Sequence, residues 1–172
     1  FDHVFRANPT LDFAPGTRFR YSNLGYVLLG QLIERVSGQP YQDYIQQHII
    51  SPVGANNNLS FSLETSRHAT GYQKRWSWLN ALLGWMIDKQ RLMGPHEGGW
   101  KPFRPFYVNG VAYGGLMGNA EGLMRYAQAL LRPGDDTLLN ASYKRLHFEE
   151  GQIQGKPTGM SYAWFVGSLK GN

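Results

Sequence analysis

Residues 15–38 decide the fold, and they read PGTRFRYSNLGYVLLGQLIERVSG. The Pro-Gly pair at the start is a turn signal, and Ser22 or Asn23 after it can cap a helix. Gly38 supplies a C-terminal stop. Between these signals, apolar residues recur at helical spacing: Leu28, Leu29, Leu32, Ile33 and Val36. The stretch predicts a helix over about residues 23–37.

Further helices are predicted on both sides of an irregular, Gly-, Pro- and aromatic-rich segment at 94–118. One runs from Tyr41 to about Ile49 and ends before a Ser-Pro pair. Asn119 caps a second over 120–131, whose inner face is expected to carry Leu123, Ala127, Leu130 and Leu131. Asn140 can cap a third helix, which would end at about His147.

The last segment, 161–169, has the alternation of a strand with apolar residues on both faces. On one face lie Tyr162, Trp164 and Val166. Such a strand needs neighbouring strands on each side. A short strand over Leu59 to Leu63, after an asparagine turn at 56–58, is a weaker prediction.

The composition indicates a globular chain of one domain. Of its 172 residues, 42% are hydrophobic and 14% aromatic, which is enough apolar material to offset the entropy of folding. The net charge of +5 is scattered without a basic stripe, which argues against nucleic-acid binding. There is no cysteine, and the five histidines show no metal-ligand spacing. No apolar run approaches the roughly 18 residues of a membrane span.

Residues 76–87, which read WSWLNALLGWMI, predict a helix that is apolar on most of its surface. Burial in the core is the simpler explanation. Alternatively, Trp78, Leu82 and Trp85 present an apolar face to a partner, an acyl chain or a membrane surface.

The usual nucleophile signatures are absent from these residues, since there is no Ser-x-x-Lys, Gly-x-Ser-x-Gly, His-Glu-x-x-His or P-loop. What remains is Tyr21-Ser22-Asn23 at the mouth of the first helix. In its context, residues 15–38, this tripeptide closely resembles the second motif, Tyr-x-Asn, of the β-lactamase-like serine hydrolases: class C β-lactamases, D-alanyl-D-alanine carboxypeptidases and related esterases. Other segments resemble the family in the same order: Ser51-Pro52-Val53-Gly54, Gly71-Tyr72, the glycine-rich 112–116, and 162–167.

The resemblance implies an α+β fold of the β-lactamase/transpeptidase type. Residues 1–172 would form a single partial domain, with the helix-rich region at about 1–150 and the start of the returning antiparallel sheet at about 158–172. The family's first motif, Ser-x-x-Lys, is expected upstream of Phe1, and its third, Lys-Thr-Gly or His-x-Gly, downstream of Asn172. We therefore expect an internal piece of the enzyme that is inactive by itself. The family resemblance also suggests a periplasmic or other extracytoplasmic location.

The implied reaction is acyl transfer from a small amide or ester substrate through a serine ester, without metal or cofactor. Such chemistry needs a serine oxygen, a base and a proton donor for the leaving group, all within hydrogen-bond reach. The resemblance assigns proton relay to Tyr21 and substrate binding to Asn23, Gly114 and Gly115. Without the resemblance, Tyr21 would be read as a packing residue. Ser22 is expected to cap the helix rather than to act as a nucleophile.

One local departure concerns the approach to the later helix. Where the family usually has Ser-Thr-Ala-x-Asp, this chain has Gly-Asn-Ala-Glu-Gly at 118–122. Asn119 still suits a helix cap, but a polar contact would be lost. Two other functions stay open: a catalytically silent ligand-binding module of the same fold, and a membrane-surface or partner-binding protein that uses segment 76–87.

Overall fold

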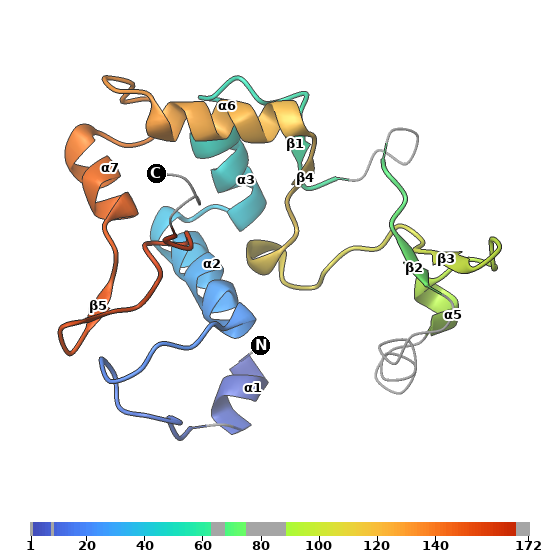
Figure 1. Ribbon diagram of the computed structural model, residues 1–172, viewed down its shortest axis with the longest axis horizontal. Helices are drawn as coiled ribbons and strands as arrows, with labels where there is room; N and C mark the ends of the chain where they lie inside the picture. Colours follow the sequence, from blue (N-terminus) through green and yellow to red (C-terminus); the bar gives the residue numbers. More distant parts are fainter. Residues whose placement is uncertain (1, 8, 63–67, 75–88, 168–172) are drawn as a thin grey trace.

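The longest helix of the described residues, α2 (Asn23–Ser37), lies in the middle of the helical part of the computed structural model (Figure 1). The structure describes residues 2–7, 9–62, 68–74 and 89–167. Ser22 caps α2, because its Oγ accepts a hydrogen bond from the Gly25 backbone N–H at 3.2 Å. Gly38 ends the helix in the left-handed conformation (φ 71°), with its N–H bonded to the Glu34 carbonyl. The predicted helix and both of its ends are confirmed.

A small hydrophobic core of the described residues follows α2. Helix α3 (Tyr41–Ile45) continues into one turn of π-helix, η1 (Gln46–Ile50), so the second predicted helix is confirmed with a wider last turn. Ile50 is completely buried and forms a small core with Ala55 and Leu59. Around this core pack three partly buried apolar residues, Ile45, Val53 and Phe61.

Three small antiparallel pairs make up the sheet content of the described residues. Strand β1 (Leu59–Ser60) pairs with β4 (Met117–Gly118), and β2 (Tyr72–Lys74) pairs with β3 (Trp100–Pro102). β5 (Gln152–Ile153) and β6 (Lys156–Pro157) form a hairpin that the sequence did not predict. The β1–β4 pair matters most for the site, because it joins the core to the start of the next long helix.

That helix, α6 (Ala120–Leu131), begins at the predicted cap, Asn119. The prediction of its inner face was partly wrong. Leu130 is buried, but Leu123 and Leu131 are 59% and 67% exposed. The buried positions are Gly122, Ala129 and Leu130. Gly122 is buried because Asn58 and Leu59 lie against the first turn of the helix. The leucine spacing alone did not show on which side that neighbour lies.

The C-terminal part corrects a second prediction. Helix α7 (Ala141–Phe148) is capped by Asn140 as expected, but 161–167 does not form a strand. Its backbone turns at Ala163 (φ 71°), and within the described residues its β-contact is one isolated bridge, Met160 to Phe165. A strand needs a paired neighbour, and none lies beside this segment in the described residues.

Trp164 attaches this segment to α7 instead. Its indole N–H donates to Nε2 of His147 at 2.7 Å, and its ring lies 6.3 Å from that of Phe148. Burial lowers the pKa of His147, which favours the neutral ring that can accept this bond.

The remaining elements are α1 (Asp2–Ala7), which the sequence did not predict, α5 (Lys89–Leu92) and the 3-10 turn η2 (Val111–Tyr113). β2, β3 and α5 lie together on the side of the molecule away from α7 (Figure 1). The predicted helix at 76–87, with Trp78, Leu82 and Trp85, falls outside the described residues and stays a prediction. Within the parts that the structure describes, no helix has the length and apolar character to cross a membrane.

Candidate active site

Tyr21 lies in the irregular stretch that leads into α2. Its side chain is 60% exposed, and its ring lies 6.1 Å from that of Tyr26 at an angle of 44°. Among the described residues, the Tyr21 hydroxyl has no hydrogen-bond partner. The phenol is therefore open to contact with a group from outside these residues.

The sequence allowed either Ser22 or Asn23 to cap α2, and the structure distinguishes them. Ser22 is the cap, with its backbone extended (φ −146°, ψ 116°) and its hydroxyl bonded to Gly25. Asn23 is the first residue of α2 and is exposed, and the capping bond comes from Ser22 and not from its amide. A side-chain amide in that position can donate to and accept from a ligand.

The glycine-rich segment 110–115 packs against the middle of α2. A Cβ on Gly30 would lie 2.6 Å from the Cβ of Ala112, and one on Gly110 would lie 3.1 Å from the Val27 side chain. Glycine at 30 and 110 therefore permits close contact between helix and loop. This contact gives the segment a defined place on α2.

Gly114 and Gly115 differ in their surroundings. Gly115 closes a turn, since its N–H donates to the Val111 carbonyl at 2.9 Å and a Cβ there would lie 2.7 Å from Val111 Cα. Gly114 is exposed, and a Cβ there would meet nothing within 4 Å. Gly115 is thus required by the turn, whereas Gly114 leaves backbone accessible from outside.

The two parts of the predicted site both lie on or against helix α2, but at different places along it. Tyr21 and Asn23 lie at its N-terminal end, and segment 110–115 lies against its middle. Asn23 and Gly30 are seven positions apart, which is about 10 Å along a helix. No hydrogen bond within the described residues links Tyr21 or Asn23 to Gly114 or Gly115.

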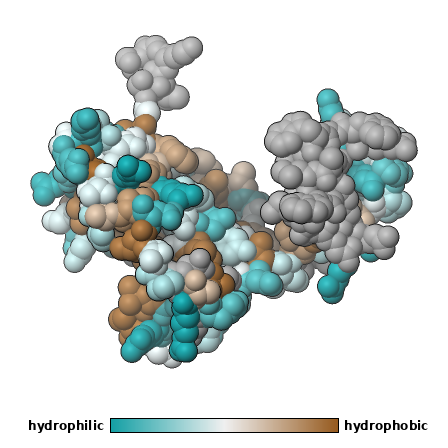
Figure 2. Space-filling model, turned by 90° about the horizontal axis from the view of Figure 1, so that it is seen from below, coloured by the Kyte–Doolittle hydropathy of each residue, from teal (hydrophilic) through white to brown (hydrophobic). Residues whose placement is uncertain are grey.

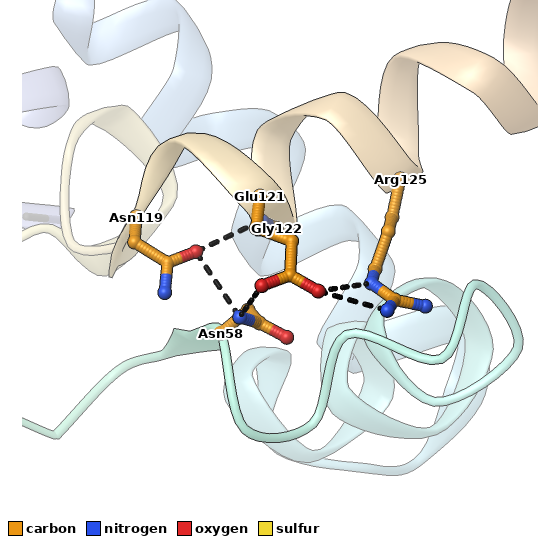
Figure 3. Close-up of polar contacts among 5 residues, drawn as sticks. All are labelled: Asn58, Asn119, Glu121, Gly122 and Arg125. Carbon is orange, nitrogen blue, oxygen red and sulfur yellow. Dashed lines mark hydrogen bonds and ion pairs between the residues drawn. The ribbon is translucent and has the colours of Figure 1, made fainter.

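A polar cluster that sequence reasoning missed lies at the start of α6 (Figure 3). The Asn119 side-chain oxygen accepts from the Gly122 N–H at 2.9 Å and from the Asn58 amide at 3.2 Å. The Asn58 amide also contacts Glu121 Oε2 at 3.4 Å, and Arg125 donates to Glu121 Oε1 at 2.8 and 3.2 Å. The hydrogen bond from Arg125, followed by its charge, lowers the pKa of Glu121.

Asn58 could have been suspected only weakly from the sequence. It is the last of three consecutive asparagines, 56–58, which together predict a turn but do not distinguish the residue that reaches across the chain. The turn itself is confirmed.

An open pocket of about 840 Å³ lies elsewhere, between the end of α6 and α7. Its lining combines apolar and charged side chains, among them Leu131, Arg132, Lys144 and Phe148. None of the residues predicted for the site lines it. For metals, the described residues hold no group of three histidine, aspartate or glutamate side chains arranged to bind an ion.

The chain as a whole is similar to known proteins of one family. Residues 5–172 match the family model described as Beta-lactamase. The chain is 38% identical over 65 residues to Penicillin-binding protein 4* of Bacillus subtilis (strain 168), which covers 35% of this chain and 14% of that protein. It is 28% identical over 158 residues to Protein flp of Staphylococcus aureus (strain MW2), which covers 91% of this chain and 28% of that protein.

A solved structure agrees with the match. The octameric penicillin-binding protein homologue from Pyrococcus abyssi superposes with a TM-score of 0.62 at 26% identity, over 87% of this chain and 30% of that one. The fold is therefore the α+β fold that the sequence predicted. The chain spans less than a third of each of these three proteins.

Proposed function

The chain belongs to the Beta-lactamase family, and on this basis we propose that it is part of a serine hydrolase that transfers an acyl group from an amide or ester to a serine and then to water. The observation that carries the proposal is the family match over residues 5–172 together with Tyr21-Ser22-Asn23 at the start of a capped helix. Neither a metal nor a cofactor has a role in the proposed reaction.

The serine of the proposed acyl-enzyme lies outside this chain, because residues 1–172 contain no Ser-x-x-Lys. Its hydroxyl proton must leave as the new ester bond forms, and the leaving group must gain a proton as the old bond breaks. The exposed Tyr21 hydroxyl, without a partner in the described residues, is suited to pass this proton once the serine and its lysine are in place.

The substrate side is assigned to Asn23, Gly114 and Gly115. The Asn23 amide is exposed at the helix start and can pair with a substrate amide or ester. Gly114 is also exposed; its N–H already donates to the Val111 carbonyl, so its own carbonyl is the group it offers to a substrate N–H. The proposed substrates are a β-lactam, a peptide ending in D-alanine or a simple ester. These assignments rest on the family motif and on the exposure of the residues.

The test compares the complete protein with residues 1–172 expressed alone. Both are incubated with a fluorescent penicillin and a fluorophosphonate, and adducts are located by mass spectrometry. We expect one adduct per complete protein, on a serine of Ser-x-x-Lys, and none on the chain alone. Binding of the penicillin without any adduct would contradict the hydrolase and favour a ligand-binding module of the same fold. An adduct on Ser22 would contradict the assignment of that residue as a cap.

A further inference from the structure

Asn58 joins two parts of the chain that lie 61 residues apart. Its side-chain amide is half-buried between the turn before β1 and the first turn of α6, and it contacts oxygens of both Asn119 and Glu121 (Figure 3). The backbone reinforces the contact, because the Asn119 N–H donates to the Asn58 carbonyl at 3.1 Å. Side chain and backbone of one residue therefore hold the junction between β4 and α6.

The glycines on either side of Asn119 make this approach sterically feasible. A Cβ on Gly118 would lie 2.4 Å from the Asn58 carbonyl oxygen. A Cβ on Gly122 would lie 2.7 Å from Leu59 Cγ and 2.9 Å from Asn58 Cβ. Larger residues at 118 and 122 would push residues 58–59 away. The contacts of Asn58 therefore depend on glycine at both positions.

The amide nitrogen of Asn58 has an acceptor for each of its two hydrogens. Its amide nitrogen carries two hydrogens and faces two acceptors, Asn119 Oδ1 and Glu121 Oε2. The other oxygen of Glu121 is occupied by Arg125, which fixes the orientation of the carboxylate. An aspartate at position 58 would have the same shape but no donor, and would place a carboxylate against two oxygens.

The junction also fixes one end of the glycine-rich segment. Only Leu116 separates Gly115 from β4, which pairs with β1 through Leu59–Gly118 and Ser60–Met117. The other end is held on α2 at Gly30 and Val27. Segment 110–118 is therefore fixed at two points, and Asn58 supplies the side-chain contacts at one of them.

We propose that Asn58 is a positioning residue that holds segment 110–118, and with it Gly114 and Gly115, in the place where the substrate binds. Its contribution to activity rests on the proposed function, whereas its hold on the segment does not. The role is carried by a neutral donor that links Asn119 to Glu121.

The experiment uses four forms of the complete protein: wild type, Asn58→Asp, Asn58→Asp with Glu121→Gln, and Asn57→Ala. Asn57 is the matched control, because it lies in the same turn with an exposed side chain and no hydrogen bond among the described residues. In the double variant, the new amide at position 121 can donate to the new carboxylate at position 58, which reverses the direction of the lost bond. For each form, the rate of amide hydrogen exchange is measured over residues 110–119 and over α2. The kinetic constants kcat and KM are measured with p-nitrophenyl acetate.

We expect Asn58→Asp to accelerate exchange over 110–119 but not over α2, and to raise KM about 5- to 30-fold with kcat within about twofold. The double variant should recover most of both effects, and Asn57→Ala should match the wild type. Three results would overturn the proposal. Exchange over 110–119 could be as slow in Asn58→Asp as in Asn57→Ala, or Asn58→Asp could accelerate exchange in α2 as much as in 110–119. The third is a double variant that recovers neither slow exchange nor the wild-type KM. If the wild type does not turn over the ester, this result contradicts the proposed function but not the role of Asn58. The hydrogen-exchange rates over 110–119 then decide whether Asn58 holds the segment.

Discussion

At the scale of single residues, Tyr21 can be tested by removing only its hydroxyl. Tyr21→Phe keeps the ring and its contact with Tyr26, so the complete protein should melt within about 1 °C of the wild type, whereas turnover of p-nitrophenyl acetate should fall about 10²- to 10⁴-fold. Tyr26→Phe is the control and should retain most of its activity. A Tyr21→Phe protein with nearly full turnover would make Tyr21 a packing residue.

Ser22 and Asn23 are expected to separate stability from substrate binding. Ser22→Ala removes the cap of α2 and should lower the free energy of unfolding by about 1 kcal/mol, with KM unchanged. Asn23→Ala leaves the cap in place and should instead raise KM. Denaturant unfolding and steady-state kinetics on both variants provide the comparison. If Asn23→Ala lost stability and kept its KM, the amide would serve the helix and not the substrate.

At the scale of elements, the contact between α2 and η2 can be tested at Gly30. Gly30→Ala would bring its Cβ within 2.6 Å of Ala112 and should cost about 1–3 kcal/mol of stability in the complete protein. Gly25→Ala on the same helix is the matched control, since its Cβ would meet only Ser22 at 3.7 Å. It should stabilise the helix by about 0.5–1 kcal/mol.

The cause of the Gly30 effect can be isolated by a compensating change. Ala112→Gly removes the atom that the added methyl group at position 30 would meet, so the double variant Gly30→Ala with Ala112→Gly should regain much of the lost stability. Thermal melts of the two single variants and the double variant measure the coupling. Additive losses would show that the close approach in the structure is not the source of the cost.

At the scale of the whole molecule, the described residues leave large apolar faces uncovered. On α2, four residues are between 47% and 79% exposed: Leu28, Leu29, Leu32 and Val36. On α6, Leu123, Met124 and Leu131 are similarly exposed, and Phe165 reaches 84%. Figure 2 shows hydrophobic residues exposed among hydrophilic ones on the face of the molecule turned to the viewer. Exposed apolar area on this scale is typical of surfaces that are covered in the functional molecule.

We therefore expect residues 1–172 expressed alone to be marginally stable. Burial in the described residues is concentrated around Ile50, Ala55 and Leu59, and the apolar faces of α2 and α6 contribute little while exposed. The isolated chain should associate, which light scattering detects, and it should bind the dye ANS. The complete protein should neither associate nor bind ANS, and it should melt cooperatively. A monomeric isolated chain with a cooperative melt would contradict this expectation.

The sequence by itself determined the local structure. The prediction was correct for three helix caps, Ser22, Asn119 and Asn140, and for the stop at Gly38. A cap is a hydrogen bond between residues two or three positions apart, and the left-handed conformation of a glycine is a property of that one residue, so both can be read from the local sequence. The motif at 15–38 also determined the family. Tyr21, Asn23, Gly114 and Gly115 remain proposals, because the groups they would act on lie outside the described residues.

Only the tertiary structure decided which faces are buried and which distant residues meet. The spacing of Leu123, Leu130 and Leu131 is the same whichever neighbour covers α6, so burial at Gly122 and exposure at Leu123 depend on where β1 lies. The strand pattern at 161–169 likewise requires partners that no local signal supplies, and the segment turns at Ala163 instead. Asn58 is the clearest case, because its two acceptors lie more than 60 residues away and become its neighbours only when β1 pairs with β4.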